Sequence, residues 1–252
     1  MLIAFDVGNS TVDCGLFDGE LLLATWRYEL DRRRTAEAYR AMLSNSLSEQ
    51  GLQPPKCGIA ASVAVGVSDV LAASTESLWG VPLVIVNNAG EIGIDVHVST
   101  PERVGIDRLL SAAEGYRITG GATVVADLGT AITVDLVSSE GIFLGGTITA
   151  GLRQTSKALA IGTSLLPEAD IRRPESVLGK STLECIRAGV VYGAAGAVDR
   201  LASELVKEAG GTAEVLLTGG DAQLLSPFLS VRHSVENALV LRGLNRVFQS
   251  GQ

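Results

Sequence analysis

Short apolar runs separated by turns dominate the first 30 residues of the chain. One run covers positions 2–5 and leads into Asp6, and a second starts at Val12 and ends at the turn Asp18-Gly19. Short apolar runs bounded by such turns are typical of buried strands. The apolar segment 21–28 favours a third antiparallel strand, so we expect the chain to open with a three-stranded meander.

The same pattern returns at 123–141, near the middle of the chain. An apolar run reaches Asp127, then come Gly129 and Thr130, a second apolar run, and the turn Glu140-Gly141. Each copy joins two predicted strands through an Asp-x-Gly turn. A repeat separated by about half of the chain predicts two related lobes, with the Asp-Gly loop of each facing one cleft.

Helix-like and strand-like segments alternate after each meander. In the first half we expect a helix at 35–50, a strand at 58–62, a helix at 67–79 with Ser68 as candidate N-cap, and a strand at 81–86. In the second half we expect strands at 123–128, 132–138, 142–144 and 213–218, and helices at 152–161, 182–209, 222–229 and 236–248.

The boundary between the lobes is expected where a helix at 108–116 gives way to Thr119-Gly120-Gly121. We therefore assign residues 1–117 to an N-terminal lobe and 118–252 to a C-terminal lobe. A three-strand meander followed by alternating helices and strands is the pattern of ribonuclease-H-like domains. The predicted fold class is α/β, with two such lobes, each a mixed sheet flanked by helices.

Composition narrows the classes of function. A chain of 252 residues with 46% hydrophobic residues has ample length for real cores, and its net charge of −8 disfavours nucleic acid or an anionic membrane as partner. No apolar run approaches the roughly 18 residues of a membrane span. Three widely spaced cysteines (Cys14, Cys57 and Cys185) and an apolar start interrupted by Asp6 lead us to expect a cytoplasmic protein with reduced thiols.

A basic run, Arg32-Arg33-Arg34 after Asp31, is the local exception to the acidic composition. A solvated loop before a helix explains such a run. The alternative is a loop that lies near an anionic ligand.

The two Asp-x-Gly loops carry a candidate chemistry. Glycine lets main-chain N–H groups approach phosphate oxygens, and Asn9, Ser10 and Thr11 add neutral donors. Asp6 would hold Mg²⁺ through water, because a carboxylate and a phosphate repel each other. A plain tight hairpin uses the same residue types. Two copies at matching places favour phosphate binding over that alternative.

Two lobes that each open on Asp-x-Gly resemble the superfamily of sugar kinases, actin and heat-shock chaperones. Members of that superfamily bind ATP between their lobes, with a late Gly-Gly pair near the nucleoside. Gly219-Gly220, between a predicted strand and a predicted helix, stands at that place. A helix-entry loop is the simpler explanation of this pair taken alone.

A further stretch, Gly105-Ile106-Asp107-Arg108, resembles the Gly-x-Asp-Arg signature of type III pantothenate kinases. The resemblance covers almost the whole chain, in order and at suitable spacing. Its other parts begin at Asp6, Asp127, Gly145, Gly179, Tyr192 and Leu239.

The resemblance implies ATP-dependent phosphorylation of the 4′-hydroxyl of pantothenate, the first step towards coenzyme A, with Asp107 as general base. Implied substrate-binding residues are Gly105, Ile106, Asp107, Arg108, Val98 and Thr182, the last from the neighbouring subunit of a homodimer. Implied ATP-binding residues are Asp6, Val7, Gly8, Asn9, Ser10, Thr11, Val12, Asp13, Thr130, Gly219 and Gly220. Implied cations are Mg²⁺ near Asp6 and a monovalent cation, K⁺ or NH₄⁺, near Asp127.

The chemistry of Asp107 agrees with its implied role. A primary alcohol is a weak nucleophile, so a carboxylate must accept its proton as the O–P bond forms. Arg108 would keep that carboxylate ionised and offer two N–H groups to an anionic substrate. The alternative is structural: Asp107 would cap the helix 108–116, and Arg108 would form a surface ion pair.

Three residues depart from the family pattern. Val98 stands where many members have Tyr, Ala150 where Pro is usual, and Ser181 where Asn is common before Thr182. None of the three removes a carboxylate. Two alternatives therefore remain at this point: a catalytically silent nucleotide-binding regulator of the same fold, and a kinase of another small hydroxy acid.

Overall fold

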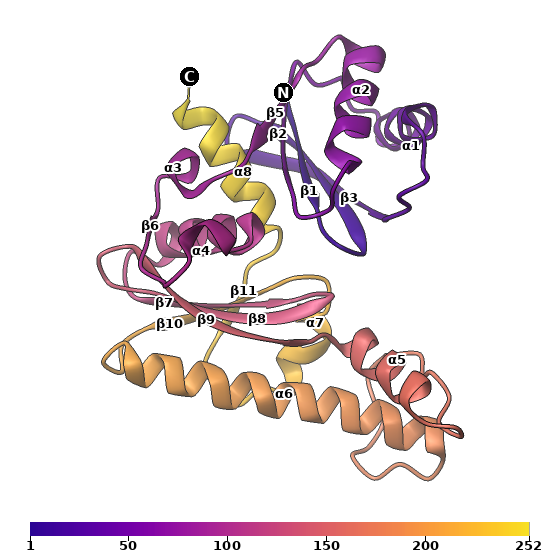
Figure 1. Ribbon diagram of the computed structural model, residues 1–252, viewed down its shortest axis with the longest axis vertical. Coiled ribbons are helices and arrows are strands. Elements are labelled where there is room, and N and C mark those ends of the chain that lie inside the picture. Colours follow the sequence, from indigo (N-terminus) through magenta and orange to yellow (C-terminus); the bar gives the residue numbers. More distant parts are fainter. Residues whose placement is uncertain (252) are drawn as a thin grey trace. The chain divides into compact units, whose positions relative to one another are not determined.

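The computed structural model describes residues 1–251, in which two sheets each carry helices (Figure 1). Its contacts divide the chain into two compact units. The first unit contains residues 1–95, 100–114 and the stretch from 238 onward, and the second contains 96–99 and 115–237. The lobes expected from the sequence, 1–117 and 118–252, differ from these units chiefly at the C-terminal helix, which belongs to the first unit together with residues 1–95.

The first unit is built on a five-stranded sheet of order β3-β2-β1-β4-β5. Its first three strands form an antiparallel meander, and β4 and β5 continue the sheet in parallel with β1. The strands are β1 (Leu2–Val7), β2 (Thr11–Asp18), β3 (Leu21–Glu29), β4 (Cys57–Ser62) and β5 (Leu83–Val86). The helices are α1 (Ala36–Glu49), α2 (Val67–Trp79), α3 (Ala89–Ile92), the first part of α4 (Ile106–Thr119) and α8 (Leu239–Ser250).

Helices cover both faces of this sheet because β1 is apolar on both. Ile3 and Phe5 pack in one cluster with residues of α1 and α2, whereas Leu2 and Ala4 pack in another with residues of α4 and α8. Successive side chains of a strand point to opposite faces, which explains the alternation. The first unit thus has helices, sheet and helices in three layers.

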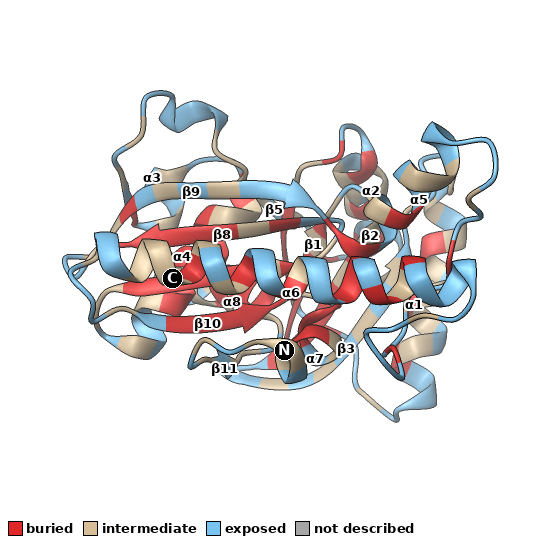
Figure 2. Cartoon of the chain, turned by 90° about the horizontal axis from the view of Figure 1, so that it is seen from below, coloured by how far each residue is buried: buried red, intermediate tan, exposed pale blue. Residues whose placement is uncertain are grey.

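The second unit repeats the arrangement around a six-stranded sheet of order β11-β10-β7-β8-β9-β6. Helix α6 runs along one face of this sheet (Figure 1), and the strands that it covers are mostly buried (Figure 2). The strands are β6 (Asp95–Val96), β7 (Thr123–Leu128), β8 (Ala131–Val137), β9 (Ile142–Ala150), β10 (Glu214–Thr218) and β11 (Ser234–Val235). The helices are α5 (Leu152–Gly162), α6 (Thr182–Glu208) and α7 (Ala222–Leu225), besides the end of α4, with a 3₁₀ turn at Ser226–Phe228. The 3₁₀ turn at Pro101–Arg103 belongs to the first unit.

Strand registers confirm the internal repeat. In the first sheet Asp6 lies opposite Asp13, and in the second Asp127 lies opposite Thr133. The second and third strands of each meander also share an irregularity, after Leu16 in one copy and after Leu136 in the other. Five strands of each sheet therefore match in order and direction, and the two sheets share the position of a bulge, as expected of two ribonuclease-H-like lobes; β6 is an additional edge strand of the second sheet.

The third strand of the second meander is longer than predicted. It continues past residue 144 to Ala150, because Gly145 and Gly146 lie inside it and do not end it. Gly145 has a φ of +100°, and a side chain at Gly146 would collide with the main chain of β8 at Val134 and Asp135. The two glycines permit close contact between strands, a role that resembles a turn signal in sequence.

Several helix ends also differ from prediction. The helix predicted at 222–229 ends at Leu225, because Pro227 lacks the N–H that a continuing helix needs. The last helix starts at Leu239, three residues later than predicted, after Ala238 takes a φ of +60°. Helix α4 starts at Ile106, two residues earlier than predicted.

The predicted N-cap of α2 is wrong. The helix does start at Val67, but its N-cap is Gly66, with a φ of +81° and no side-chain capping bond, and Ser68 lies inside the first turn. The first N–H groups of α2 therefore have no side-chain partner at the cap. In the part of the chain that the structure describes, no helix has the length and apolar character needed to cross a membrane.

Candidate active site

The first Asp-Gly loop is a tight connection between β1 and β2. The N–H of Gly8 donates to the carbonyl of Thr11 at 2.9 Å, which closes the loop while Asn9 at its tip stays exposed. Val7 and Val12 are fully buried. These valines therefore have only main-chain groups to offer a nucleotide, whereas the side chains of residues 9–11 are at least partly accessible.

Asp13 is held by its own sheet. Its Oδ2 accepts a 3.1 Å hydrogen bond from the Thr11 hydroxyl, and its Oδ1 lies 2.6 Å from the Nε of Arg27 on β3. Both carboxylate oxygens are thus engaged by protein groups, and one of them orients a hydroxyl of the loop. Next to it, burial raises the pKa of the Cys14 thiol well above its usual range, and the neighbouring Asp13 charge adds to this shift. Cys14 therefore stays protonated and packs as an apolar residue.

The second Asp-Gly loop is shorter than the first, and a main-chain hydrogen bond from Gly151 holds it. The N–H of Gly129 donates to the carbonyl of Ala131 at 3.1 Å, and Thr130 is exposed. The N–H of Gly151 donates to the Thr130 carbonyl at 3.0 Å, and a Cβ at Gly151 would lie only 2.5 Å from that oxygen. Gly151, part of the family-like motif, is therefore required for close contact with this loop.

Gly219 lies against Asp127. Gly219 directly follows β10, whose last residue, Thr218, lies opposite Asp127 near the end of the parallel strand β7. Gly219 has a φ of +90°, and a Cβ there would collide with the Asp127 carboxylate and lie 2.6 Å from the main chain of Leu128. The structure thus brings the late Gly-Gly turn and the second Asp-Gly loop together. Gly220 follows, exposed.

Asp107 stands in the first turn of α4. Its Oδ1 accepts a 2.9 Å hydrogen bond from the main-chain N–H of Arg108. Because the helix starts one residue earlier, Asp107 is not its N-cap, although a carboxylate in a first turn is favoured by the helix dipole. A Cβ at Gly105 would lie 2.5 Å from the same Oδ1. Glycine at 105 therefore leaves room for the carboxylate.

The neighbours of Asp107 differ in exposure. Ile106 is buried in the core of the first unit, whereas Asp107 and Arg108 are half-buried. The Gly-x-Asp-Arg stretch thus anchors one apolar side chain and presents two charged ones.

Thr182 opens α6 and is exposed. The residue before it, Ser181, is the N-cap, and its Oγ accepts a 3.3 Å bond from the N–H of Glu184. Ser and Asn are about equally good N-caps, so the departure at 181 leaves the helix start intact. The carboxylate of Glu184 accepts a 2.8 Å hydrogen bond from the main-chain N–H of Lys180.

Val98 lies beside β9. Its neighbour His97 donates its N–H to the Phe143 carbonyl at 2.9 Å, and a Cβ at Gly145 would be 3.3 Å from the Val98 side chain. An aromatic side chain at 98 would therefore meet the Gly145 main chain that Val98 now covers.

Two ion pairs in these regions have no short-range signal in the sequence. One joins Asp13 to Arg27, and the other joins Asp221 to Arg153 at 3.9 Å. Each pair is separated by more than ten residues, so only the folded chain shows it.

Among residues 1–251, no group of three or more His, Cys, Asp or Glu side chains could hold a metal. Single carboxylates such as Asp6 fit Mg²⁺, which keeps several waters and takes one or two carboxylates besides phosphate oxygens.

Comparisons with known proteins agree with this geometry. The chain is 39% identical over 249 residues to a type III pantothenate kinase from Thermus thermophilus, covering 98% of both chains. A solved structure described as a Baf family transcriptional activator from Campylobacter jejuni matches with a TM-score of 0.60 at 19% identity, covering 99% of this chain and 98% of that one. The ROK hexokinase of Thermus thermophilus matches at 0.50 and 16%, covering 100% and 99%. These two similarities support the two-lobed α/β fold. The model of the type III pantothenate kinase family matches residues 2–204, and with this match and the full-length relative the chain belongs to that family.

Proposed function

We propose that this protein transfers the γ-phosphoryl group of ATP to the 4′-hydroxyl of pantothenate, with Asp107 as general base. Family membership over nearly the full length carries the reaction. The position of Asp107, in a first helical turn beside a glycine that makes room for it, supports the assignment of the base.

The base works by position. A carboxylate within hydrogen-bond reach of the alcohol takes its proton while the oxygen attacks phosphorus. The N–H of Arg108 holds one carboxylate oxygen of Asp107, which leaves the other for the substrate hydroxyl. The Arg108 guanidinium supplies a planar fork of donors suited to a carboxylate or a phosphoryl group.

The two Asp-Gly loops bind the phosphates of ATP in this proposal. Within residues 8–11, Asn9 and Ser10 provide main-chain N–H groups and Ser10 a hydroxyl. The Gly8 N–H closes the loop, and the Thr11 hydroxyl, which donates to Asp13, fixes its end. Thr130 provides a further hydroxyl from the second loop. Mg²⁺, held through water by Asp6, would neutralise charge on the phosphates.

Asp127 is the proposed neighbour of a monovalent cation, K⁺ or NH₄⁺. It is half-buried at the end of β7, and Gly219 and Gly129 leave space around its carboxylate. A carboxylate and main-chain oxygens are suitable ligands for such an ion. Replacement of K⁺ by Na⁺ in the assay tests this assignment directly.

A homodimer is the proposed assembly, with Thr182 reaching the substrate of the partner subunit. Large apolar side chains are exposed around α5 and the start of α6. Leu165 and Leu178 are 90% and 72% exposed, and Tyr192 on α6 is also accessible. A contiguous apolar surface is typical of a protein–protein interface, and a dimer would cover side chains such as these. Sedimentation at micromolar concentration should show a dimer, and a monomer there would remove the cross-subunit role of Thr182.

One assay tests the reaction, the base and the cation together. Wild type and Asp107→Asn are incubated with pantothenate, ATP and Mg²⁺ in K⁺ or in Na⁺, and phosphopantothenate is measured. We expect turnover that requires K⁺ and falls about 100-fold or more in Asp107→Asn. Glu102→Gln, an exposed neighbouring carboxylate on the 3₁₀ turn, is the control and should keep its rate. Equal rates in wild type and Asp107→Asn would refute the base.

A further inference from the structure

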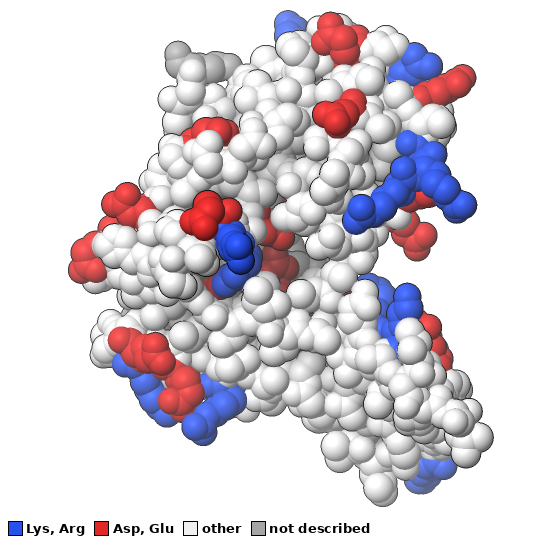
Figure 3. All heavy atoms as spheres, in the orientation of Figure 1, with Lys and Arg blue, Asp and Glu red and all other residues white. Residues whose placement is uncertain are grey.

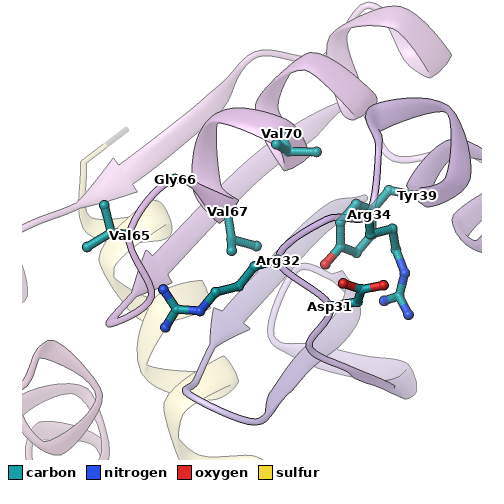
Figure 4. A pocket seen from close by; sticks show the side chains of 8 residues that line it. All are labelled: Asp31, Arg32, Arg34, Tyr39, Val65, Gly66, Val67 and Val70. Carbon is teal, nitrogen blue, oxygen red and sulfur yellow. The ribbon is translucent and has the colours of Figure 1, made fainter.

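A small hollow on the first unit lies outside the residues assigned above. It is lined by the loop after β3, by the start of α2 and by Tyr39 of α1 (Figure 4). The loop is joined to the first Asp-Gly loop, because the N–H of Leu30 donates to the Ser10 carbonyl at 2.8 Å. The basic run of the sequence thus lies beside the proposed phosphate loop, and basic side chains gather on that face (Figure 3).

Tyr39 places an unsatisfied hydroxyl in the hollow. The residue is only 1% exposed, yet its Oη has no hydrogen-bond partner. Figure 4 shows this oxygen turned towards the loop that carries Asp31 and Arg32. A buried hydroxyl without a partner costs free energy, so a ligand that accepts its proton would be favoured here. Burial raises the pKa of Tyr39 and outweighs the nearby Arg34 guanidinium, which lowers it, so the hydroxyl stays protonated and can donate.

Two arginines supply positive charge. Arg34 holds the Glu29 carbonyl with one nitrogen at 2.8 Å, and its guanidinium carbon lies 5.2 Å from the centre of the Tyr39 ring. Arg32 makes no hydrogen bond or ion pair with any residue in 1–251, and its side chain extends towards Val65 (Figure 4). Both guanidiniums therefore have donors to offer a ligand.

The carboxylate of Asp31 is already engaged. It accepts the N–H of Arg33 at 2.9 Å and lies 3.7 Å from the Nε of the same residue. The charge of Arg33 thereby offsets that of Asp31, and Arg32 and Arg34 remain for the hollow.

The start of α2 adds a second kind of donor. Its N-cap, Gly66, gives no side-chain bond to the first turn, and Gly66 and Val67 line the hollow. The uncapped N–H groups and the helix dipole favour an anion at this end of the thirteen-residue helix. Asp69 in the same turn is exposed and does not line the hollow.

We propose that this hollow is an anion site that binds a phosphate group through Arg32, Arg34, the Tyr39 hydroxyl and the start of α2. A phosphate group accepts hydrogen bonds from such donors and is attracted by the two guanidinium charges. The group is either free inorganic phosphate or part of the triphosphate of a nucleotide, since both present the same oxygens.

The test compares the effect of inorganic phosphate, against chloride at equal ionic strength, on the thermal unfolding midpoint of four proteins. These are wild type, Tyr39→Phe, Arg32→Gln and, as matched control, Arg172→Gln, at an exposed arginine of the second unit. Phosphate should raise the midpoint of wild type and of the control alike. The phosphate concentration that gives half of the effect should rise on the order of tenfold in Tyr39→Phe and Arg32→Gln.

A loss of folding stability in Tyr39→Phe would not account for a weaker phosphate effect. Tyr39→Phe removes a hydroxyl that lacks a partner, so without phosphate its unfolding midpoint should not fall. An equal response to phosphate in all four proteins would overturn the proposal, because the phosphate would then act elsewhere, for example at the first Asp-Gly loop.

Titration with a non-hydrolysable ATP analogue separates the two sources. Weaker analogue binding by Arg32→Gln assigns the site to a nucleotide phosphate. Unchanged analogue binding together with a lost phosphate effect assigns it to free phosphate. The phosphate measurement needs no turnover, so failure of pantothenate phosphorylation would leave its result readable.

Discussion

Asp13 and Arg27 face each other directly across β2 and β3, and their side chains meet at 2.6 Å. The same carboxylate holds the hydroxyl of Thr11. One ion pair thus connects an ordinary strand position of β3 to the loop that we expect to contact ATP.

Asp13→Ala should therefore weaken ATP binding more than it weakens the fold. The exposed part of the ion pair contributes about 0.2–1 kcal/mol to stability. Release of the Thr11 hydroxyl should raise the KM for ATP severalfold and leave kcat within about twofold, since no reacting atom is touched. Steady-state kinetics at saturating pantothenate check this. Asp18→Ala, at the exposed end of the same strand, is the control. An unchanged KM for ATP would show that Asp13 does not position the loop.

Gly105→Ala should impair catalysis without unfolding the protein. A Cβ at this position would lie 2.5 Å from Asp107 Oδ1, so the carboxylate must move. Displacement of a base by about 1 Å costs on the order of 100-fold in rate. We expect kcat to fall by that order. Gly121→Ala, where a Cβ meets nothing within 4 Å, should keep full activity. A normal kcat in Gly105→Ala would mean that the Asp107 carboxylate need not hold its present position.

Gly219→Ala should change the cation requirement. Its φ of +90° and that of Gly211, +87°, impose similar strain on an alanine, of about 1–3 kcal/mol. Only at 219 would the new Cβ displace the Asp127 carboxylate. The K⁺ concentration for half-maximal rate should therefore rise about tenfold in Gly219→Ala and stay unchanged in Gly211→Ala, after both are matched for folded fraction. Equal K⁺ curves would separate Asp127 from the cation.

The start of α6 should lose support in acid. The Lys180 N–H and then the Ser181 hydroxyl, both near Glu184, lower the pKa of its carboxyl below the usual value near 4.5. A group with a lowered folded pKa contributes stability above its unfolded pKa and loses that contribution as the pH falls through the folded value. Urea midpoints of wild type should thus exceed those of Glu184→Gln at pH 7, and the difference should shrink progressively as the pH falls below the usual carboxyl value near 4.5. A difference that does not shrink with falling pH would exclude this carboxylate as its cause.

Local patterns predicted most of the fold. The Asp18-Gly19 and Glu140-Gly141 turns, with positive φ at both glycines, occur where expected, and helix α2 has the predicted limits. Such features depend on neighbours in sequence, which apolar periodicity and turn residues encode. The family and the two-lobed fold were likewise predicted, because their motifs are spread over the whole chain.

Features set by distant residues were not predictable. Gly145 and Gly146 resemble a turn until β8 is seen to pass against them. The start of α8 depends on the left-handed conformation of Ala238, which an alanine in the sequence does not predict. The pairing of Asp13 with Arg27 follows only from the register of β2 and β3. The assigned roles of Asp107, Asp127 and Thr182 stay predictions that the experiments above address.

The return of α8 to the first unit has a consequence for biosynthesis. Leu241 and Leu244 of α8 pack in the same core as Leu2 of the first strand. Gly243 lets α8 pack closely against α4, because a Cβ at this position would lie only 2.8 Å from the Leu110 carbonyl oxygen. Translation makes these residues after residues 115–237. One face of the first sheet therefore stays uncovered until α8 has been made, whereas residues 115–237 can complete their own core before that. The second half of this chain should fold before the first.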